Sequence, residues 1–382
     1  YNKSVKVKIQ LRNRRETKST VSEPVKILVL VPAYNEAASI QHTIASVKNQ
    51  TRQVDAIIVG DDCSTDNTAE LAAKENVHVV THALNLGNKA FNQQAIIDSA
   101  VFQNLVKSEN PHNIVVCIID ADTILKNDAV EKIIRVFETD AEVMSASGYV
   151  VPSELDTMWQ KARLVEYHAS LNLQKSVQND ISSILVVSGC FAAIRYSSVL
   201  KHSGFDTRSI TEDFGFTCEQ NLDREKIRFV SDAICYTKEP PTLNILLKQL
   251  DRWYSGFFQN LKIHRKKILG CSNLKFTLLL VLFMSEGLYS LIIPLFLLSL
   301  WVFPGMFPFS AYNAFLFFLC LDIPLVVVPA MYGAAKHKQC LITLTSIPYF
   351  MMLRCIMMYA WWKAFIRELF TTKTLTKWDK GH

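Results

Sequence analysis

The sequence predicts an α/β domain with a mainly parallel sheet, followed by a membrane-associated C-terminal region. Short runs of apolar, often β-branched residues alternate with segments of helical spacing over roughly the first 240 residues. Such alternation is typical of βαβ units, in which crossover helices cover both faces of the sheet. From Leu274 onward the composition changes abruptly to three long apolar stretches. The chain therefore combines a soluble, catalytic-looking domain with a membrane tail.

The elements of the α/β domain follow one another in regular order. The first strand is expected at residues 25–31, a continuous apolar run that ends at Pro32, and a helix with an apolar stripe at Ile40, Ile44 and Val47 follows it. Further apolar runs predict strands at residues 56–59, 77–80, 114–119, 143–151 and 227–236. Helical spacing predicts helices at residues 37–50, 67–75, 89–103, 127–138, 158–177 and 242–262. Residues 184–195 form an apolar segment interrupted at Ser188-Gly189-Cys190.

The three apolar stretches cover residues 278–303, 311–335 and 341–362. A helix of about 20 residues crosses the hydrocarbon core of a bilayer, and each stretch is long enough. Long buried core helices are the alternative, and three such stretches in succession argue against it. Basic residues just before the first stretch predict a cytosolic position near anionic lipid headgroups; they are Lys262, His264, Arg265, Lys266 and Lys267. We expect an integral protein of the plasma or inner membrane with a cytosolic catalytic domain.

Three charged residues, Glu286, Asp322 and Arg354, lie within the apolar stretches. Charges at membrane depth usually face a bundle interior or a wet pathway, which predicts a conduit beside the active site. Snorkelling to the interface is the alternative for each. Basic residues also flank residues 341–362 on both sides, against the positive-inside tendency for a single crossing. A re-entrant segment near Pro348 would resolve this conflict.

Composition excludes several other classes of protein. The net charge of +6 comes without a basic stripe or a recognisable nucleic-acid motif, so no nucleic-acid partner is expected. The nine cysteines are scattered singly, without metal-ligand spacing or a disulfide framework, which fits a reducing cytosol. No signal peptide is visible. Because the sequence opens on Tyr1 rather than Met, we expect sequence upstream of it.

These observations divide the chain into five segments. They are a polar lead-in at residues 1–24, the α/β domain at 25–240, an interfacial helix region at 241–273, a membrane domain at 274–370 and a polar tail at 371–382.

Acidic residues follow apolar runs at several points. Asp120 and Asp122 come directly after residues 114–119, and Asp61 and Asp62 end the run at 56–59. The carboxyl ends of parallel strands form the ligand crevice of an open α/β sheet. Paired carboxylates there can hold a divalent cation through hard oxygen ligands. Helix capping would explain Asp122, but Asp120 has no such structural reason, because burying an unpaired carboxylate is costly.

Other candidate residues are weaker when each is taken alone. The turn from Pro32 to Glu36, which includes Tyr34, follows a strand and opens a helix, but a capping turn explains it equally well. Lys89 suits a phosphate, although a solvated lysine is the default. Thr211-Glu212-Asp213 also reads as an ordinary N-cap with acidic first-turn residues.

The segment Gln249-Leu250-Asp251-Arg252-Trp253 lies on the last helix before the membrane region. The i, i+3, i+4 spacing places Gln249, Arg252 and Trp253 on neighbouring parts of one helix face. Arg252 can clamp a phosphate with its planar fork, and Trp253 offers a flat platform for a sugar ring. An amphipathic interfacial helix with a Trp anchor is the alternative.

Taken in order, these motifs resemble the processive family 2 glycosyltransferases, which include cellulose, chitin, hyaluronan and poly-N-acetylglucosamine synthases. The resemblance covers residues 25–259 and the membrane region that follows. It implies a nucleotide-diphosphate-sugar fold of the GT-A type, a divalent cation (Mg²⁺ or Mn²⁺) and inversion at the anomeric carbon. The matching residues are Pro32, Tyr34, Glu36, Asp61, Asp62, Lys89, Asn92, Asp120, Asp122, Thr211, Glu212, Asp213, Gln249, Arg252 and Trp253.

The resemblance also implies a role for each residue. Asp61 or Asp62 would bind the uridine, Asp120 would contact the nucleotide sugar and Asp122 the metal. Asp213 would be the general base on the acceptor hydroxyl. The remaining roles are shared: the donor site would include Pro32, Tyr34, Glu36, Lys89, Gln249, Arg252 and Trp253, and the acceptor site Gly189, Cys190, Glu212 and Trp253.

The chain departs from the family pattern at two motif positions, and the family's N-terminal membrane helices lie outside the printed sequence. Cys63 stands where glycine is common, and Asp251 replaces a residue that is usually neutral or basic. Neither change touches the implied chemistry directly.

The resemblance predicts a membrane-integrated inverting enzyme that polymerises a β-linked polysaccharide from a UDP-sugar and translocates it. UDP-N-acetylglucosamine is the preferred donor, UDP-glucose comes next, and alternating use with UDP-glucuronate stays open. The expected partners are the UDP-sugar donor, the growing polysaccharide, membrane lipid and accessory membrane subunits. A non-processive transfer to a polyprenyl phosphate or another lipid is the alternative, and a membrane scaffold with a decayed transferase domain is a third.

Overall fold

The computed structural model describes residues 24–270, 272–303, 305–306, 308, 310–371 and 374–375. The expected polar lead-in at residues 1–24 and the polar tail at 371–382 lie almost entirely outside the described residues.

A mixed, mainly parallel sheet of eight strands forms the centre of the N-terminal domain, in the order β3-β2-β1-β4-β7-β6-β8-β5. The first four strands in this order, β3, β2, β1 and β4, are parallel to one another, and β6 is parallel to β8. The antiparallel strand β7 joins β4 to β6 and so links the two parallel parts. The strands are β1 (Lys26–Ala33), β2 (Ala56–Asp61), β3 (His78–Thr81), β4 (Ile114–Ile119), β5 (Ile124–Leu125), β6 (Val143–Pro152), β7 (Phe191–Arg195) and β8 (Lys226–Thr237).

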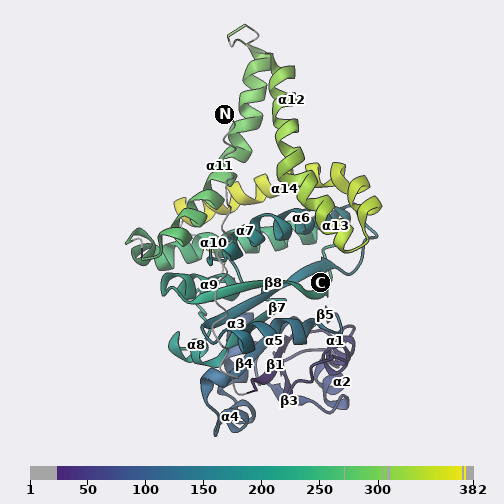
Figure 1. Cartoon of the computed structure of the whole chain (residues 1–382), viewed down its shortest axis with the longest axis vertical. Helices are drawn as coiled ribbons and strands as arrows, with labels where there is room; N and C mark the ends of the chain where they lie inside the picture. The colour runs from purple at the N-terminus through teal and green to yellow at the C-terminus, as the bar shows by residue number, and fades with distance from the viewer. Residues whose placement is uncertain are drawn as a thin grey trace, which may run out of the picture.

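Helices cover both faces of this sheet, as the sequence predicts for strands that are apolar throughout (Figure 1). All six residues of β4 are buried. The helices of the domain are α1 (Ile40–Lys48), α2 (Thr68–Lys74), α3 (Lys89–Asp98), α4 (Ala100–Val106), α5 (Ala129–Thr139), α6 (Met158–Asn172), α7 (Gln174–Asp180), α8 (Tyr196–Lys201) and α9 (Glu212–Leu222), with a 3₁₀ turn at Pro111–Asn113.

Two predicted helices are each divided in two. The helix expected at residues 89–103 breaks at Ser99, whose backbone is extended and whose hydroxyl accepts from the N–H of Phe102 at 3.2 Å. Ser99 therefore ends α3 and caps α4, a role that serine side chains favour. The helix expected at residues 158–177 ends at Asn172, and α7 begins at Gln174.

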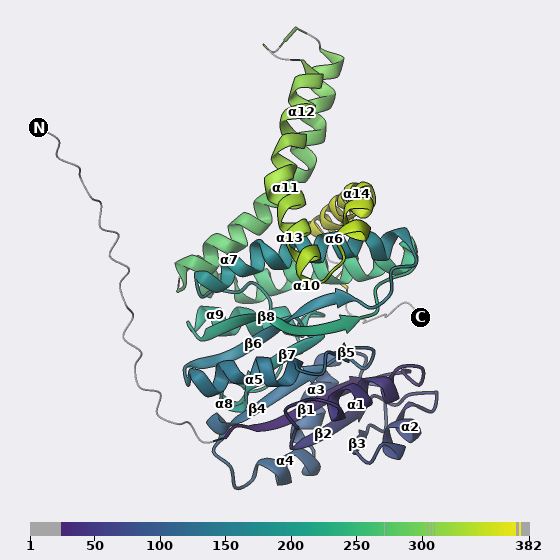
Figure 2. The ribbon, with the colours of Figure 1, turned by 45° about the vertical axis from the view of Figure 1, so that its right-hand side comes forward.

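A long amphipathic helix, α10 (Leu243–Leu269), connects this domain to the apolar region. In Figure 2, α6, α7 and α10 lie between the sheet and the C-terminal helices. Apolar side chains of α6 and α10 pack against the last helix, α14 (Cys340–Phe370), around Leu250, Phe350 and Leu353. The helix region expected at residues 241–273 thus holds the catalytic domain against the apolar helices.

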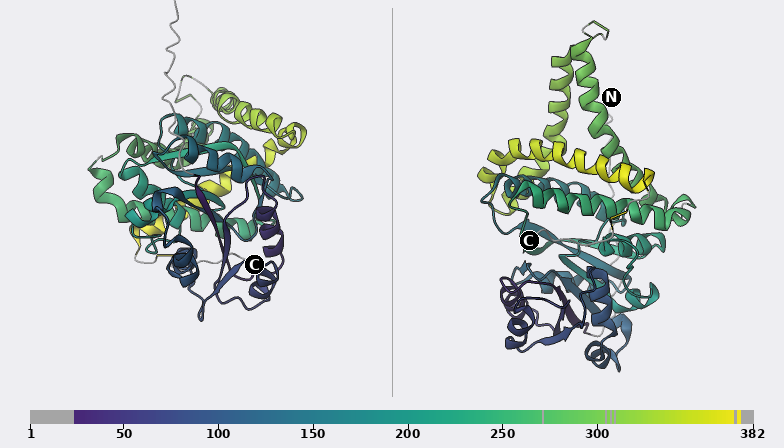
Figure 3. Two further views of the ribbon diagram at one scale, coloured as in Figure 1. Left: turned by 60° about the horizontal axis from the view of Figure 1, so that its bottom comes forward. Right: turned by 180° about the vertical axis from the view of Figure 1, so that it is seen from behind.

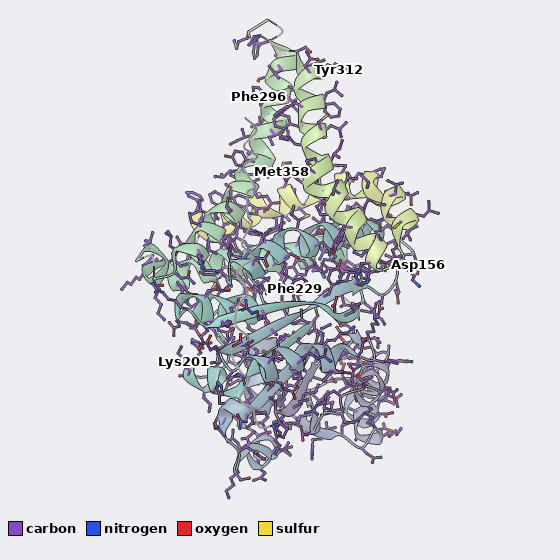
Figure 4. All side chains as sticks on the ribbon, in the orientation of Figure 1. Asp156, Lys201, Phe229, Phe296, Tyr312 and Met358 are labelled. Atoms are coloured by element: carbon purple, nitrogen blue, oxygen red, sulfur yellow. The ribbon has the colours of Figure 1, made fainter. Side chains whose placement is uncertain are left out.

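Among the described residues, three helices are long and apolar enough to cross a membrane, at Leu274–Val302, Ala311–Lys336 and Cys340–Phe370. The first is α11; the second comprises α12 (Ala311–Asp322), a π-helical segment (Ile323–Val327) and α13 (Val328–Lys336). α11 and α12 form a hairpin that projects from the domain, with Tyr312 near its far end and Phe296 part of the way along it (Figure 4).

α14 differs from the hairpin in its direction, because it lies across the base of α11 and α12 and alongside α10 (Figure 3). It is one continuous helix through Pro348, so the re-entrant segment considered near that proline is not formed. A helix lying beside α10 keeps both of its basic ends near the catalytic domain.

Two of the three charged residues in the apolar stretches bind each other. Arg354 Nη1 lies 2.7 Å from Asp322 Oδ2, which ties α14 to α12. Glu286 of α11 interacts electrostatically with Arg354 as well. The three charges therefore gather between helices, as expected for charged groups at membrane depth.

Candidate active site

The predicted carboxylates lie at one edge of the sheet. The strands β2, β1 and β4 are parallel neighbours, so their carboxyl ends meet. Ala33 at the end of β1 is paired in register with Asp61 at the end of β2, and Asp120 directly follows β4.

Lys89, the first residue of α3, joins three parts of this edge. Its ammonium lies 2.5 Å from Asp120 Oδ1 and 3.5 Å from Glu212 Oε1, and it donates to the carbonyl of Gly189 at 3.1 Å. Burial alone would lower the pKa of Lys89, but the carboxylates around it, Asp120 first, raise that pKa above its ordinary value. Lys89 therefore stays charged, and the default interpretation of a solvated surface lysine does not apply.

Glu212 and Asp213 open α9 and face the same charge. Thr211, which precedes them, makes no capping hydrogen bond with its side chain. Its hydroxyl instead accepts from Asn260 Nδ2 at 3.2 Å, which joins the start of α9 to α10. Gln93 Nε2 donates to Glu212 Oε1 at 3.3 Å. The side-chain capping that would have explained this acidic triplet is therefore missing.

The Asp213 carboxylate is held by two backbone N–H groups. Gly189 donates to Oδ2 at 3.1 Å and Phe214 donates to Oδ1 at 2.8 Å. A Cβ at position 189 would lie 3.0 Å from Lys89 Nζ and 3.3 Å from Asp213 Oδ2, so glycine lets the loop approach both groups closely. The two N–H groups thus fix the orientation of the Asp213 carboxylate, and its role as the general base stays a prediction.

Asp122 and Arg252 complete the group of charges. Burial, and then the charge of Asp120, raises the pKa of Asp122 to about 7. Burial lowers the pKa of Arg252, while the charges of Glu212, Asp120, Asp213 and Asp122 oppose that change. Arg252 of α10 thus lies within electrostatic reach of all four carboxylates, and the structure brings the acidic motifs together near Lys89 and Arg252.

Asp61 and Asp62 lie at the adjoining strand end and are almost fully buried. Asp61 Oδ2 accepts from the N–H of Ser64 at 3.4 Å, whereas Oδ1 is buried without a hydrogen-bond partner among the described residues. Asp62 Oδ1 accepts from the N–H of Leu86 at 2.7 Å, and burial raises the pKa of Asp62. An orphaned carboxylate oxygen such as Asp61 Oδ1 suits an N–H donor of a bound ligand.

The turn from Pro32 to Glu36 lies beside these two aspartates. Its backbone is held from the opposite loop, because Glu36 N–H donates to Thr68 Oγ1 at 2.7 Å. The carboxylate of Glu36 accepts from Ser39 Oγ at 2.7 Å, and Tyr34 is half-buried. The assignment of Pro32, Tyr34 and Glu36 to the donor site stays a prediction.

Gln249, Arg252 and Trp253 lie in the first half of α10. Gln249 Oε1 is buried and has no hydrogen-bond partner among the described residues. The indole of Trp253 packs beside α6 with the guanidinium of Arg163 4.8 Å from its ring centroid, while Arg252 faces the carboxylates. Adjacent helical residues point about 100° apart, so the motif serves two neighbouring surfaces.

A buried ionic network under Trp253 was not predicted from the sequence. Arg163 is fully buried, with Nε 3.0 Å from Glu239 Oε2 and Nη2 2.7 Å from the hydroxyl of Tyr167. It also pairs with Glu166. Tyr167 donates to Glu239 Oε1 at 2.6 Å, which closes the network. Arg163 therefore fixes one face of the Trp253 ring.

A second unpredicted residue, Lys175 of α7, lies behind the Gly189 loop. Its ammonium is 2.9 Å from Ser147 Oγ and 3.0 Å from Ser188 Oγ. Burial lowers the pKa of Lys175 to about 8. The thiol of Cys190 lies in this interior, next to Cys235. In this loop, Gly189 contacts Asp213 and Lys89 through its backbone, whereas the Cys190 thiol points into the interior. The assignment of Cys190 to the acceptor site stays a prediction.

Comparisons with known proteins agree with this geometry. A family model for "Glycosyl transferase family group 2" matches residues 115–366, more than half of the chain, so the chain belongs to that family. The expected membership of the family 2 glycosyltransferases is thereby confirmed.

The curated relatives match part of their length. The poly-beta-1,6-N-acetyl-D-glucosamine synthase of Staphylococcus aureus (strain COL) is 29% identical over 255 residues, which are 64% of this chain and 60% of that protein. The enzyme of the same name from Staphylococcus epidermidis is 26% identical over 230 residues, 60% of this chain and 54% of that protein. The chain thus spans about 60% of the curated relatives that it matches.

A solved structure shows the same fold over nearly the whole chain. The mannosyltransferase PcManGT from Pyrobaculum calidifontis, in complex with GDP-Man and Mn²⁺, covers 92% of this chain and 89% of its own. The TM-score is 0.59 at 17% sequence identity, a likeness that concerns the fold alone. It confirms the predicted GT-A-type arrangement.

Proposed function

We propose that this member of glycosyl transferase family group 2 polymerises a β-linked polysaccharide from a UDP-sugar, with UDP-N-acetylglucosamine preferred, by a single inverting displacement. One observation carries the proposal: four carboxylates from two separate segments, the end of β4 and the start of α9, gather around Lys89 and Arg252 at the carboxyl edge of the sheet. The named activity of the staphylococcal relatives supports the choice of sugar.

Asp61, Asp62, Lys89 and Arg252 would bind the donor. The orphaned Oδ1 of Asp61 would accept from the uracil N–H, while the fixed cations Lys89 and Arg252 would face the diphosphate. Arginine and lysine are the residues that proteins use for phosphate, as a planar fork and a point charge respectively. Gln249, whose Oε1 is buried without a partner among the described residues, would bind a donor hydroxyl.

The residues present fit a divalent cation beside the donor. Asp120 raises the pKa of Asp122, so the two carboxylates are close enough for their charges to interact, and a cation would relieve their repulsion. Asp122 would hold the ion, with Asp120 next to it, through hard oxygen ligands that suit Mg²⁺ or Mn²⁺. Such an ion, when bound, supplies Lewis-acid stabilisation of the departing diphosphate.

Asp213 would act on the acceptor. Its carboxylate, oriented by the N–H groups of Gly189 and Phe214, would take the proton from the acceptor hydroxyl while that oxygen attacks the anomeric carbon. Glu212, held by Lys89 and Gln93, would lie beside the reaction centre, where burial raises its pKa. Trp253, with one face covered by Arg163, would present the other face to the terminal sugar.

The membrane region would place this site beside an exit. We expect the α11–α12 hairpin to span the membrane, α14 to lie along its cytosolic surface, and the catalytic domain to face the cytosol. The charges of Glu286, Asp322 and Arg354 between the helices suit a polar path for the product. Accessory membrane subunits would cover the remaining apolar surface of the hairpin, where Val281, Leu282 and Tyr312 are exposed.

The experiment is a transfer assay with purified protein in lipid and a panel of labelled UDP-sugars. We expect a polymer that migrates as a high-mass smear with UDP-N-acetylglucosamine. Asp213→Asn should reduce turnover by about 10²–10⁴-fold, the usual contribution of a positioned general base, while nucleotide binding measured by calorimetry stays unchanged. An organic-soluble monosaccharide product would indicate the lipid transferase instead, and wild-type turnover in Asp213→Asn would refute the assignment of the base.

A further inference from the structure

A second cluster of metal-ligand side chains lies away from the carboxylates of the proposed donor site. Asp206 follows α8, Glu219 lies on α9 and His264 lies on α10, and one possible ligand atom from each lies within 4.8 Å of the other two. The cluster is on the α8 side of the domain, which Lys201 marks in Figure 4.

One member of the cluster is buried with an unpartnered nitrogen, and a second is only loosely paired. His264 is only 6% exposed, and its Nε2 has no hydrogen-bond partner in the part of the chain that the structure describes. The nearest cationic atoms to the Glu219 carboxylate, His202 Nδ1 and Arg208 Nη2, are each 3.7 Å away, beyond hydrogen-bond distance. Buried polar groups of native proteins nearly always have partners, so Nε2 of His264 indicates a missing ligand, and the Glu219 carboxylate, 18% exposed, lies close enough to contribute to the same site.

The third member, Asp206, is paired with Arg208. Arg208 Nε lies 2.8 Å from Oδ1 and Nη2 lies 2.7 Å from Oδ2, a bidentate ion pair. This pair would neutralise Asp206, but it leaves Nε2 of His264 without a partner among the described residues. The Arg208 side chain is 61% exposed, so it can turn into solvent and free the carboxylate at little steric cost.

We propose that Asp206, Glu219 and His264 bind a divalent first-row transition-metal ion, with Zn²⁺ preferred over Ca²⁺. One imidazole nitrogen and two carboxylate oxygens form a donor set typical of Zn²⁺ and Mn²⁺, whereas Ca²⁺ takes oxygen ligands almost exclusively. Zn–N and Zn–O bonds of about 2.0–2.2 Å require the ligand atoms to move closer together by roughly an ångström. Flexible carboxylate side chains allow that change.

The ion would join the two helices that carry the proposed catalytic groups. Glu219 lies on α9, which begins at Glu212 and Asp213, and His264 lies on α10, which carries Arg252. A metal bond between these helices would fix Arg252 relative to the base. The site is structural and does not depend on the activity proposed above.

The test uses the full chain, purified without a polyhistidine tag and stripped of metal by a chelator. Thermal unfolding in detergent is measured with and without Zn²⁺, Mn²⁺ or Ca²⁺, and bound metal is counted by elemental analysis. We expect Zn²⁺ to raise the unfolding midpoint by several degrees and Ca²⁺ to leave it unchanged. Asp122→Asn should keep the Zn²⁺ response, because that residue belongs to the donor site.

Two further variants separate a metal site from a simple ion pair. Glu219→Gln and His264→Gln are nearly isosteric and should each lose the Zn²⁺ response, measured against their own metal-free midpoints. Arg208→Ala should bind Zn²⁺ more tightly than the wild type, because the competitor for Asp206 is gone. The proposal is overturned if the wild type shows no Zn²⁺ response, if Glu219→Gln responds as fully as the wild type, or if Arg208→Ala binds Zn²⁺ more weakly.

Discussion

Replacement of Arg163 by methionine tests whether the network under Trp253 holds the domain together. Methionine keeps much of the apolar stem of arginine but removes its ion pairs with Glu239 and Glu166 and its bond to Tyr167. Glu239 is almost fully buried, so its carboxylate would be left without a counter-charge. Removing one partner of a buried pair costs about 3–5 kcal/mol, because the other charge stays desolvated.

The expected change in melting temperature follows from that loss. For a domain of 150–250 residues, 1 kcal/mol shifts the midpoint by about 2–4 °C, so Arg163→Met should melt roughly 6–20 °C lower than the wild type. Arg135→Met is the matched control, since Arg135 is 67% exposed and forms an i, i+4 pair with Glu131 at 3.1 Å. Such a surface pair contributes about 0.3–0.5 kcal/mol.

Thermal unfolding in detergent, followed by the recovery of monodisperse protein, provides the measurement. The double variant Arg163→Met with Glu239→Gln should be less destabilised than the sum of the two single changes, because it leaves only Glu166 without its counter-charge. Polymer made from UDP-N-acetylglucosamine by Arg163→Met should also be shorter, because Trp253 loses the cation that packs on it. If Arg163→Met melts within the range of Arg135→Met, the network does not stabilise the fold as argued.

Two other variants give sharp outcomes. Lys175→Met removes an ammonium whose pKa in the folded protein, about 8, lies below the ordinary 10.5 because the group is buried, so the unfolded chain binds more protons between these two pH values. The stability of the wild type relative to Lys175→Met should therefore increase as pH rises from 8 to 10.5, by about 3 kcal/mol at most. A constant difference in stability across that pH range would contradict the assignment. Asp251→Asn weakens the bidentate pair with Arg367 (2.9 and 3.0 Å) and the contact with Lys363 (3.1 Å), so it should lower the melting temperature by a few degrees, whereas Glu142→Gln at an 82% exposed pair should have almost no effect.

Much of the fold could be predicted because buried parallel strands are continuous apolar runs. Residues 114–119 illustrate this, since the predicted and observed bounds of β4 are identical. The breaks at Ser99 and Leu173 were missed, because the apolar spacing continues on both sides of each break. The antiparallel insertion of β7 was also hidden, since pairing partners far apart in the chain leave no local signal.

The carboxylates of the site were predictable for a related reason. An acid such as Asp120 at the end of a buried strand has no inexpensive structural purpose, so its presence indicates chemistry. The buried network of Arg163, Glu166 and Tyr167 could not be recognised in this way, because polar residues at i, i+3 and i+4 are also typical of an exposed helix face. Their buried partner, Glu239, lies 76 residues further along the chain than Arg163. The direction of α14 was unpredictable as well, since length and hydropathy do not distinguish a crossing helix from one that lies along a surface.

Three consecutive residues of α10 fix the positions of α14, the carboxylate cluster and α6 relative to one another. Asp251 pairs with Arg367 of α14, Arg252 faces the carboxylates, and Trp253 packs on Arg163 of α6. Side chains that follow one another on a helix point about 100° apart, so one rigid rod reaches three surfaces. The departure from the family pattern at Asp251 thus has a structural explanation, because this carboxylate binds the same turn of α10 to α14. A shift of α14 would therefore move Arg252 and Trp253, the proposed donor and acceptor residues, together.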